Sequence, residues 1–510
     1  MELQLVYRIL RKISDWSVTG YYSEILVEGS ENDKINGPVI LCSTHHNEMI
    51  DIATLAMSMP KYQGERRHVC FWAKESMFKN VIGGWIMRSS GAIAVKRNPN
   101  KSESGGLTEK EKLGEKDNEI GSLFASTTRA LTLNKVVGVF PEGTSYTQPR
   151  IVQVMPGAAR AAVEYNIWRR QNGEQDVVIV PVGIVYTDKS RYQSRLVVRY
   201  GTPINVKACC DELFSPSTSN ASATRALTKT IALRIEKALL GLTINAHDWE
   251  TLYSAGVARD IVFEDEEVPL GYWVFNTQLF VDLLTPSSSI SSESLAETKH
   301  ALIRYFALLH HTGLTHAVLY GLFPLPWYHS ATFSQHLRSL RPYSTALRSA
   351  ALTLAILPVL PLYLPAFIMS HFTARLLAMP GEEEGEAQFR SVGGGVGLGV
   401  GLAVGRGVVI QIWRRNGAKI WKSISTVEVD PDIIPYLALP PPPTNAFIRK
   451  REQARVQSDS SNIPRFNPKQ RPMITSKLLL ALLCAREEAK RAVHLLVDEA
   501  KVLPVYSKED

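Results

Sequence analysis

A histidine and an aspartate with four residues between them, His46 and Asp51, form the first pair in the sequence that could do chemistry. A carboxylate that accepts a hydrogen bond from one imidazole nitrogen fixes the tautomer and leaves the other nitrogen to act as a base. Residues five apart on a regular helix point about 140° away from each other. The pair therefore requires His46 to precede a helix, with Asn47 as its expected N-cap and the loop folding back onto Asp51.

Simpler interpretations of the same residues stay open. Asp51 could do no more than complement the dipole of its helix. His45 and His46 could serve only as caps or loop hydrogen-bonding groups. A metal site made of His45, His46, Glu48 and Asp51 would lack a distal ligand at a diagnostic spacing, so no metal site is expected.

A second polar group, Glu142-Gly143-Thr144-Ser145, directly follows the apolar run 136–140 and Pro141. Gly143 can adopt a positive φ and turn successive backbone N–H groups toward an anion. The hydroxyl groups of Thr144 and Ser145 add further donors. The sequence therefore predicts an anion-holding turn at this point.

Two cations, Lys96 and Arg97, follow the short apolar run 92–95. An arginine in this position could hold a phosphate through a planar, two-pronged contact that lysine cannot match. The alternative for Arg97 is an exposed charge at the end of a strand.

Short apolar runs, separated by stretches of helical length, predict the strands that position these side chains. The runs are residues 39–42, 69–73, 92–95, 136–140, 177–182 and 196–200. Strands that alternate with helices indicate an α/β domain with a largely parallel sheet flanked by helices. Ligands of such sheets bind at the carboxyl ends of the strands, where His46 and Glu142 both fall.

The order of these motifs resembles the PlsC-like glycerolipid acyltransferases, most closely the eukaryotic glycerol-3-phosphate or dihydroxyacetone phosphate acyltransferases. The motifs are His-x4-Asp, Gly-x-Ile-x-Val-x-Arg, Phe-Pro-Glu-Gly-Thr and Val180-Pro181-Val182, within residues 35–205. The resemblance implies a PlsC-like fold, with His46 as the general base and Asp51 as its orienting acid.

The same resemblance assigns the remaining site residues. It implies that Arg97 binds the phosphate of the acceptor and that Pro181 lies on the acyl side. It also implies that Glu142 and Gly143 shape the acceptor site. Many relatives carry arginine where this chain has Ser145, so one phosphate contact is either missing or supplied by Arg150.

The implied reaction transfers a fatty acyl group from acyl-CoA, a substrate rather than a cofactor, to the hydroxyl of glycerol 3-phosphate or dihydroxyacetone phosphate. Backbone donors near Gly143 are expected to hold the oxyanion. No G-x-S-x-G nucleophile elbow occurs in the sequence, so no acyl-enzyme is expected. The alternatives are a lysophosphatidate or other lysophospholipid acceptor, a hydrolase that activates water, and a catalytically inactive membrane scaffold.

Composition limits the partners. The 510 residues carry a formal net charge of +8 without an arginine-rich arm, so nucleic acid is not an expected partner. The five cysteines form no CxxC pattern and are expected as reduced thiols. Acyl-CoA, a phosphorylated glycerol-type acceptor and membrane lipid are the expected partners, and the oligomeric state stays open.

The pattern divides the chain into successive parts. These are an amphipathic helix at 1–24, the acyltransferase domain at 25–243 with an insertion at 98–120, a helical region at 244–341, membrane-associated segments at 342–415, and a proline-rich linker with a C-terminal helix at 416–510. The N-terminal helix either packs on the domain or lies on a membrane surface.

Membrane segments are expected in two places. Residues 345–371 are long enough to span a bilayer, but three prolines favour a bent or re-entrant segment. Residues 392–412 are apolar but rich in glycine, which disfavours a helix. The resemblance places the protein at the endoplasmic reticulum membrane with its active site facing the cytosol.

Overall fold

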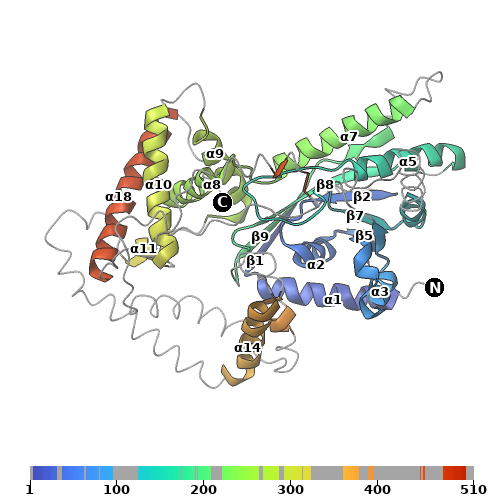
Figure 1. Cartoon of the computed structure of the whole chain (residues 1–510), viewed down its shortest axis with the longest axis horizontal. Helices are drawn as coiled ribbons and strands as arrows, with labels where there is room; N and C mark the ends of the chain where they lie inside the picture. Colours follow the sequence, from blue (N-terminus) through green and yellow to red (C-terminus); the bar gives the residue numbers. More distant parts are fainter. Residues whose placement is uncertain are drawn as a thin grey trace, which may run out of the picture. The chain divides into compact units, whose positions relative to one another are not determined.

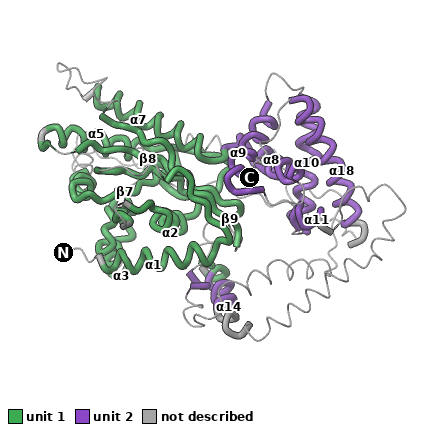
Figure 2. The backbone as a smooth tube through the Cα atoms, turned by 180° about the vertical axis from the view of Figure 1, so that it is seen from behind, with its two compact units in different colours: residues 1–244, 374–391, 441–458 green, residues 245–373, 392–440, 459–510 purple. Residues whose placement is uncertain are grey.

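The computed structural model describes most of the domain that carries the motifs. The described residues are 4–30, 37–62, 65–79, 81–95, 124–173, 175–189, 191, 193–207, 221–263, 268–286, 292–312, 314–322, 360–377, 389–390, 392–395, 448–449, 452–453 and 475–500. They fall into two compact units (Figure 2). The first comprises residues 1–244, 374–391 and 441–458, and the second comprises residues 245–373, 392–440 and 459–510.

A twisted sheet of eight strands forms the centre of the first unit (Figure 1). Its order is β1-β9-β8-β2-β7-β5-β6, with β10 also paired to β8. The strands are β1 (Glu24–Glu28), β2 (Val39–Ser43), β5 (Val69–Lys74), β6 (Ile93–Val95), β7 (Val136–Val139), β8 (Val178–Tyr186), β9 (Arg195–Tyr200) and β10 (Ile204–Asn205). β8 is antiparallel to β9 and β10, and the other neighbouring pairs are parallel. The prediction of a largely parallel α/β sheet is confirmed.

Helices cover both faces of this sheet (Figure 1). On one face, α5 (Gly157–Asn172) and α7 (Ala221–Leu242) pack on side chains such as Ile40. On the other, α1 (Gln4–Tyr21) and α2 (Glu48–Ser58) pack on side chains such as Leu41. Successive residues of a strand point to opposite faces, so the continuous apolar run of β2 supplies both cores.

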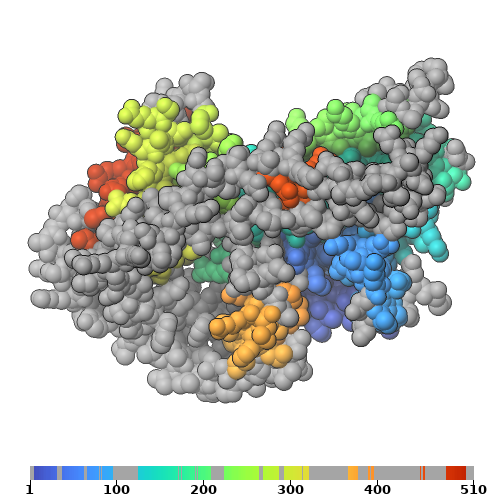
Figure 3. All heavy atoms as spheres, viewed as in Figure 1, coloured from blue at the N-terminus to red at the C-terminus, as the bar shows by residue number. Residues whose placement is uncertain are grey.

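Smaller elements complete the first unit beside β5. A two-stranded hairpin, β3 (Lys61–Tyr62) and β4 (Glu65–Arg66), precedes it. The 3-10 helix η2 (Glu75–Phe78) and helix α3 (Val81–Ser89) follow it and lead to β6. In the space-filling view of Figure 3, atoms of this light-blue region lie on the visible surface.

Gly138 of β7 permits close packing inside the sheet. A Cβ atom at this position would lie 2.6 Å from Cδ1 of Phe71 on the neighbouring strand β5. The missing side chain therefore makes room for the Phe71 ring, whose plane is nearly parallel to that of Phe140. This packing reaches the end of the sheet where the polar motifs lie.

The second unit is helical. Its described helices include α8 (Trp249–Phe263), α9 (Leu270–Leu283), α10 (Ser292–Thr312), α11 (His316–Leu322) and α18 (Thr475–Ala500). α10 packs against both α8 and α18, and Arg304 Nη1 lies 3.0 Å from Glu488 Oε2 between α10 and α18. The predicted helices after residue 243 and at the C-terminal end are present.

The predicted membrane segments fall largely outside the described residues. The segment 345–371 is described from Leu360 onward, where it belongs to helix α14 (Leu360–Leu377), and 392–412 is described only at 392–395. Within the ranges given above, the structure contains no helix with the length and apolar character needed to cross a bilayer. The insertion at 98–120 also lies outside those ranges.

Candidate active site

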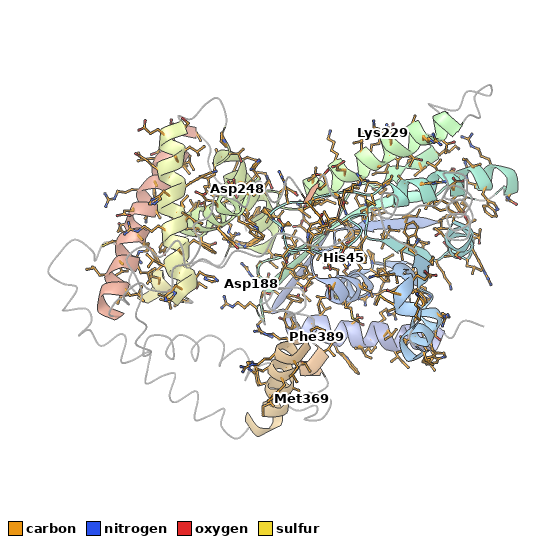
Figure 4. All side chains as sticks on the ribbon, in the orientation of Figure 1. His45, Asp188, Lys229, Asp248, Met369 and Phe389 are labelled. Carbon is orange, nitrogen blue, oxygen red and sulfur yellow. The ribbon has the colours of Figure 1, made fainter. Side chains whose placement is uncertain are left out.

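Asp51 binds His45 rather than His46. Nδ1 of His45 lies 2.9 Å from Oδ2 of Asp51. His45 follows β2 and precedes α2 in the sequence, and it is labelled in Figure 4. The predicted pairing of Asp51 with His46 is wrong by one residue. Asn47 precedes α2 as expected, and Glu48 adopts a left-handed backbone with φ of 42°. This turn follows the two histidines, and it is the ring of His45 that reaches the carboxyl group of Asp51.

The Asp51 carboxyl group is fully buried and surrounded by donors. The backbone N–H of Asn47 donates to Oδ2 at 2.7 Å, and the hydroxyl of Tyr186 donates to Oδ1 at 2.5 Å. With His45, three groups face the two carboxyl oxygens. Hydrogen bonds of this kind compensate a buried carboxylate for its lost hydration and fix its orientation.

The His45 ring is held between Asp51 and an aromatic wall. It stacks on Phe140 with 4.1 Å between ring centroids, and Phe140 in turn stacks on Phe71. The side chain of His45 is 17% exposed, so a substrate can reach the ring. Since Nδ1 is engaged by Asp51, Nε2 is the nitrogen that can exchange a proton with a substrate.

His46 has a different environment. Its ring meets the ring of Tyr146 edge-on, with the centroids 6.3 Å apart. Its Nδ1 is buried and finds no hydrogen-bond partner among the described residues. Burial, reinforced by the positive charge of Lys189, lowers the pKa of His46 to about 3. His46 is therefore a neutral imidazole without a bonded carboxylate at Nδ1.

Glu142 connects the second motif to the first. This fully buried side chain accepts a hydrogen bond at Oε1 from the backbone N–H of His45, at 2.7 Å. The side chain of Gln153 donates to the main-chain oxygen of Glu142 at 2.8 Å. Burial raises the pKa of Glu142 to about 8, against the opposing effect of hydrogen bonds from Tyr146 and His45. Glu142 thus holds the backbone segment that positions the His45 ring.

Gly143 adopts the predicted left-handed backbone, with φ of 92°. Its N–H donates to the carbonyl of Phe140 at 3.1 Å and closes a turn, so it does not point outward as an oxyanion donor would. The Thr144 hydroxyl lies 3.4 Å from the main-chain oxygen of Ser145. The turn is present, and its first N–H group is engaged within the turn itself.

Three further residues belong to the predicted site. Lys96 and Arg97 lie outside the described residues. Pro181 is buried inside the sheet, in register with Cys42 of β2, and its carbonyl accepts a hydrogen bond from Gly201 N–H at 2.8 Å. It lies one register position before the Ser43–Val182 pair that ends β2.

Sequence reasoning missed Thr44, Tyr186 and Lys189. The Thr44 hydroxyl accepts the backbone N–H of Ile184 at 2.9 Å and ties the end of β2 to β8. Tyr186 closes β8, and Lys189 follows it, with Nζ 3.5 Å from Oγ1 of Thr147. The available signal was the strand length, because β8 continues beyond the run 177–182 and ends on a buried tyrosine.

Part of the chain is similar to known proteins. Residues 24–185 match the family described as Acyltransferase, so the chain carries an acyltransferase domain over that span. It is similar to Glycerol-3-phosphate O-acyltransferase 2 of Saccharomyces cerevisiae, with 29% identity over 136 residues, which are 27% of this chain and 17% of that protein. Glycerol-3-phosphate O-acyltransferase 1 of the same yeast is 32% identical over 123 residues, which are 24% and 15% of the two chains.

The match thus spans less than a fifth of the length of these yeast relatives. Among solved structures, the chain is similar to the 1-acyl-sn-glycerophosphate acyltransferase PlsC from Thermotoga maritima. The identity is 16% and the TM-score 0.29, over 46% of this chain and 80% of that chain. The family resemblance seen in the motifs is confirmed.

Proposed function

We propose that the chain is an acyl-CoA-dependent O-acyltransferase that acylates glycerol 3-phosphate or dihydroxyacetone phosphate to a lysophosphatidate-type product. The observation that carries this proposal is the contact between His45 Nδ1 and the buried Asp51 carboxyl group at 2.9 Å. The similarity to two yeast proteins named glycerol-3-phosphate O-acyltransferases supports the choice of acceptor.

In the proposed reaction, His45 Nε2 takes the proton of the acceptor hydroxyl as its oxygen attacks the thioester carbonyl carbon. The new C–O bond forms, the C–S bond of acyl-CoA breaks, and the CoA thiolate takes a proton from Nε2–H of His45. Asp51 stabilises the intervening imidazolium through Nδ1. The step needs no cofactor, because acyl-CoA supplies the acyl group.

The general base is therefore assigned to His45 instead of His46. A base needs a lone pair that can reach the substrate and a partner that stabilises the protonated ring. His45 has Asp51 for this purpose, whereas burial keeps His46 neutral. Glu142 acts through the backbone of His45 and is a positioning residue.

A phosphorylated acceptor requires positive charge near the base. Lys189 supplies it among the described residues, since its charge acts on both His46 and Glu142. Arg97 and Lys96 are proposed as further phosphate-binding residues on the strength of the family motif. Thr144 and Ser145 are proposed as acceptor contacts.

Two further assignments come from the family alone. Pro181 is proposed to lie on the side of the acyl chain. The protein is proposed to act at the endoplasmic reticulum membrane, with its active site facing the cytosol, in phospholipid and triacylglycerol synthesis.

The experiment is an acyl-transfer assay on the full chain with labelled acyl-CoA. Glycerol 3-phosphate, dihydroxyacetone phosphate and lysophosphatidate are offered separately, alongside a reaction without acceptor. We expect transfer to one of the first two. If label is found only in the product of lysophosphatidate, then lysophosphatidate is the acceptor. Label released as free fatty acid in the reaction without acceptor would indicate a hydrolase. No turnover of acyl-CoA in any reaction would indicate a scaffold.

Two adjacent variants test the assignment of the base. His45→Gln is expected to lower kcat by about 10²- to 10⁴-fold, the usual contribution of a general base. His46→Gln, the matched control one residue away, is expected to retain most of the activity. Wild-type turnover in His45→Gln would refute the mechanism, and loss confined to His46→Gln would return the base to His46.

A further inference from the structure

A short segment from the C-terminal part of the chain belongs to the first unit, which includes residues 441–458. The structure describes four residues of this part, here called the return segment: Ile448, Arg449, Glu452 and Gln453. Their orange-red atoms lie on the visible surface in Figure 3. The return segment lies outside residues 24–185, the span that matches the acyltransferase family, so the family match does not account for it.

The return segment is packed into the domain. Ile448 is fully buried, and Glu452 is 8% exposed. The N–H groups of Glu452 and Gln453 donate to the carbonyl of Arg449 at 2.9 Å and 3.0 Å and close a turn. Burial of a large aliphatic side chain is one of the main favourable terms in folding. The return segment is therefore anchored by Ile448 and keeps its shape through its own hydrogen bonds.

Gln153 joins the return segment to the loop that carries Glu142. Its Oε1 accepts the backbone N–H of Arg449, 296 residues further along the chain, at 3.1 Å. Its Nε2 donates to the main-chain oxygen of Glu142 at 2.8 Å. An amide side chain offers both an acceptor and donors, so one glutamine can bond an N–H group and a carbonyl at the same time. Gln153 is only 4% exposed, and loss of either contact would leave buried polar groups unsatisfied.

The loop between β7 and α5 depends on contacts of this kind. Residues 140–156, all of which are described, belong to no helix or strand. Side chains bond its main chain instead: the Tyr146 hydroxyl accepts the N–H of Val152 at 2.8 Å, and Gln153 bonds the carbonyl of Glu142. Buried backbone groups outside regular structure need such partners. The position of the main chain at Glu142 therefore depends on Gln153.

The same hydrogen bonds continue to the proposed base. Glu142 Oε1 accepts the N–H of His45 at 2.7 Å, and His45 Nδ1 lies 2.9 Å from Asp51 Oδ2. A continuous series of hydrogen bonds thus runs from the main chain of Arg449 through Gln153 and Glu142 to His45.

We propose that Gln153 is a positioning residue for acyl transfer and that the return segment holds Gln153 in place. The inference rests on the proposed function, because it assigns a role relative to the base His45. Gln153 fixes the main chain at Glu142, and Glu142 fixes the main chain at His45, so that the ring faces the acceptor hydroxyl. The return segment thereby completes an active site that is otherwise built from the first part of the chain.

The test compares variants of the full chain by acyl transfer and by amide hydrogen exchange. Gln153→Met removes both hydrogen bonds at similar side-chain length. Arg449→Pro removes the N–H that Gln153 accepts, whereas Arg449→Ala keeps it and is the matched control. Gln278→Met is the control for Gln153→Met, because Gln278 in α9 also faces two main-chain groups. Its Oε1 accepts the N–H of Asn245 at 2.8 Å, and its Nε2 lies 3.4 Å from the carbonyl oxygen of Asn245.

Gln153→Met and Arg449→Pro are expected to lower kcat roughly tenfold, the factor that corresponds to about one lost hydrogen bond, while KM for acyl-CoA changes little. The N–H of His45 is expected to exchange roughly tenfold faster in both variants, because Glu142 then holds it less firmly. The two changes combined are expected to lower kcat no further than Gln153→Met alone, since both break the same contact. Arg449→Ala and Gln278→Met are expected to match wild type in kcat and in exchange at His45.

Two results would overturn the inference. One is wild-type kcat and wild-type exchange at His45 in Gln153→Met. The other is a pair of losses in kcat that multiply in the combined variant, which would reduce the return segment to a separate stabilising contact. If Gln153→Met or Arg449→Pro does not fold, Gln153→Glu decides. It keeps an acceptor for the Arg449 N–H, gives up the donor to Glu142, and is expected to lose kcat to the same extent.

The exchange measurement separates this inference from the proposed function. A chain that transfers no acyl group, but in which Gln153→Met speeds exchange at the His45 N–H, would contradict the proposed function and leave the link from the return segment to His45 standing. A chain that transfers acyl groups, with kcat and His45 exchange unchanged in both variants, would contradict this inference alone.

Discussion

The Tyr186 hydroxyl donates to Asp51 Oδ1 at 2.5 Å and joins the end of β8 to the first turns of α2. Burial raises the pKa of Tyr186 well above 10, so the hydroxyl keeps its proton and is the donor. The two oxygens of Asp51 are thereby divided between Tyr186 on one side and His45 with the Asn47 N–H on the other. The orientation of the proposed base depends on a strand that follows it by more than a hundred residues.

Removal of this hydroxyl is expected to affect both stability and turnover. Tyr186→Phe leaves a buried carboxyl oxygen without its donor, at a cost of about 1–3 kcal/mol in the free energy of unfolding. Because Asp51 then orients His45 less firmly, kcat should fall while KM for acyl-CoA changes little. Tyr200→Phe removes a buried hydroxyl that bonds Ser58 and is the control. A loss of kcat of equal size in both variants would show that Tyr186 acts through stability alone.

The raised pKa of Glu142 predicts a pH-dependent stability. The folded protein holds a proton on Glu142 up to about pH 8, whereas its ordinary pKa is 4.5. The contribution of Glu142 to the free energy of unfolding is fully present below pH 4.5 and is lost as pH rises toward 8, because only the unfolded chain gives up the proton in that range. Relative to Glu142→Gln, wild type should lose a few kcal/mol of unfolding free energy between about pH 5 and about pH 8. Denaturant unfolding of wild type and Glu142→Gln at both pH values measures this loss. An equal change of unfolding free energy with pH in the two proteins would contradict the prediction.

The lowered pKa of His46 predicts a pH dependence of stability with the opposite sign. Its pKa falls from 6.5 to about 3 in the folded protein, mainly through burial. The stabilisation is present above 6.5 and is lost as pH falls toward 3, because the unfolded chain binds a proton there and the folded chain does not. His46→Gln should therefore flatten the acid side of the stability profile. His247→Gln, at a side chain with 62% exposure, should leave that profile as in wild type.

The close packing at Gly138 predicts that a larger side chain there lowers both stability and activity. In Gly138→Ala the new methyl group would displace the Phe71 ring, which is stacked on the Phe140 ring beneath His45. Overpacking of this kind costs about 1–3 kcal/mol, and kcat should fall with it. Gly241→Ala is the control, because a Cβ there meets no described atom within 4 Å. Wild-type stability and kcat in Gly138→Ala would show that the Phe71 and Phe140 rings can shift without a cost in stability or activity.

The proposed role of Lys189 predicts that its positive charge contributes to the binding of a phosphorylated acceptor. Lys189→Met should raise KM for glycerol 3-phosphate roughly tenfold or more, as expected for a lost charge-assisted contact. KM for acyl-CoA should change little. Lys207→Met, at a half-exposed lysine near Asp176, is the matched control. An equal rise in both KM values would assign Lys189 to general attraction of anions.

The sheet could be predicted from sequence because its strands are nearly pure apolar runs. Residues 39–42 are buried on both sides, so β-branched and apolar side chains at every position mark the strand directly. The end of β8 was harder to predict, because Gly183 interrupts the apolar run and Tyr186 carries a polar group.

The histidine pairing could not be predicted at single-residue resolution. Whether Asp51 meets His45 or His46 depends on the backbone of Glu48, a non-glycine residue with positive φ that no sequence pattern specifies. The same limit applies to Gly143, where the glycine correctly predicted a turn but its N–H turned inward. Sequence patterns predicted that these polar motifs meet at one end of the sheet, whereas local backbone geometry decides which histidine bonds Asp51.

The position of β2 between β7 and β8 has a consequence for the order in which the protein folds. During synthesis, β2 and β5 emerge before β7, yet they are not neighbours, because β7 lies between them. β2 and β5 therefore cannot join one sheet until β7, which ends at Val139, has left the ribosome. β8 must follow before the Tyr186 hydroxyl can donate to Asp51. Such long-range pairing slows folding. A nascent chain that stops before β7 therefore cannot form the centre of the sheet, and it also lacks Tyr186, which donates to Asp51 Oδ1.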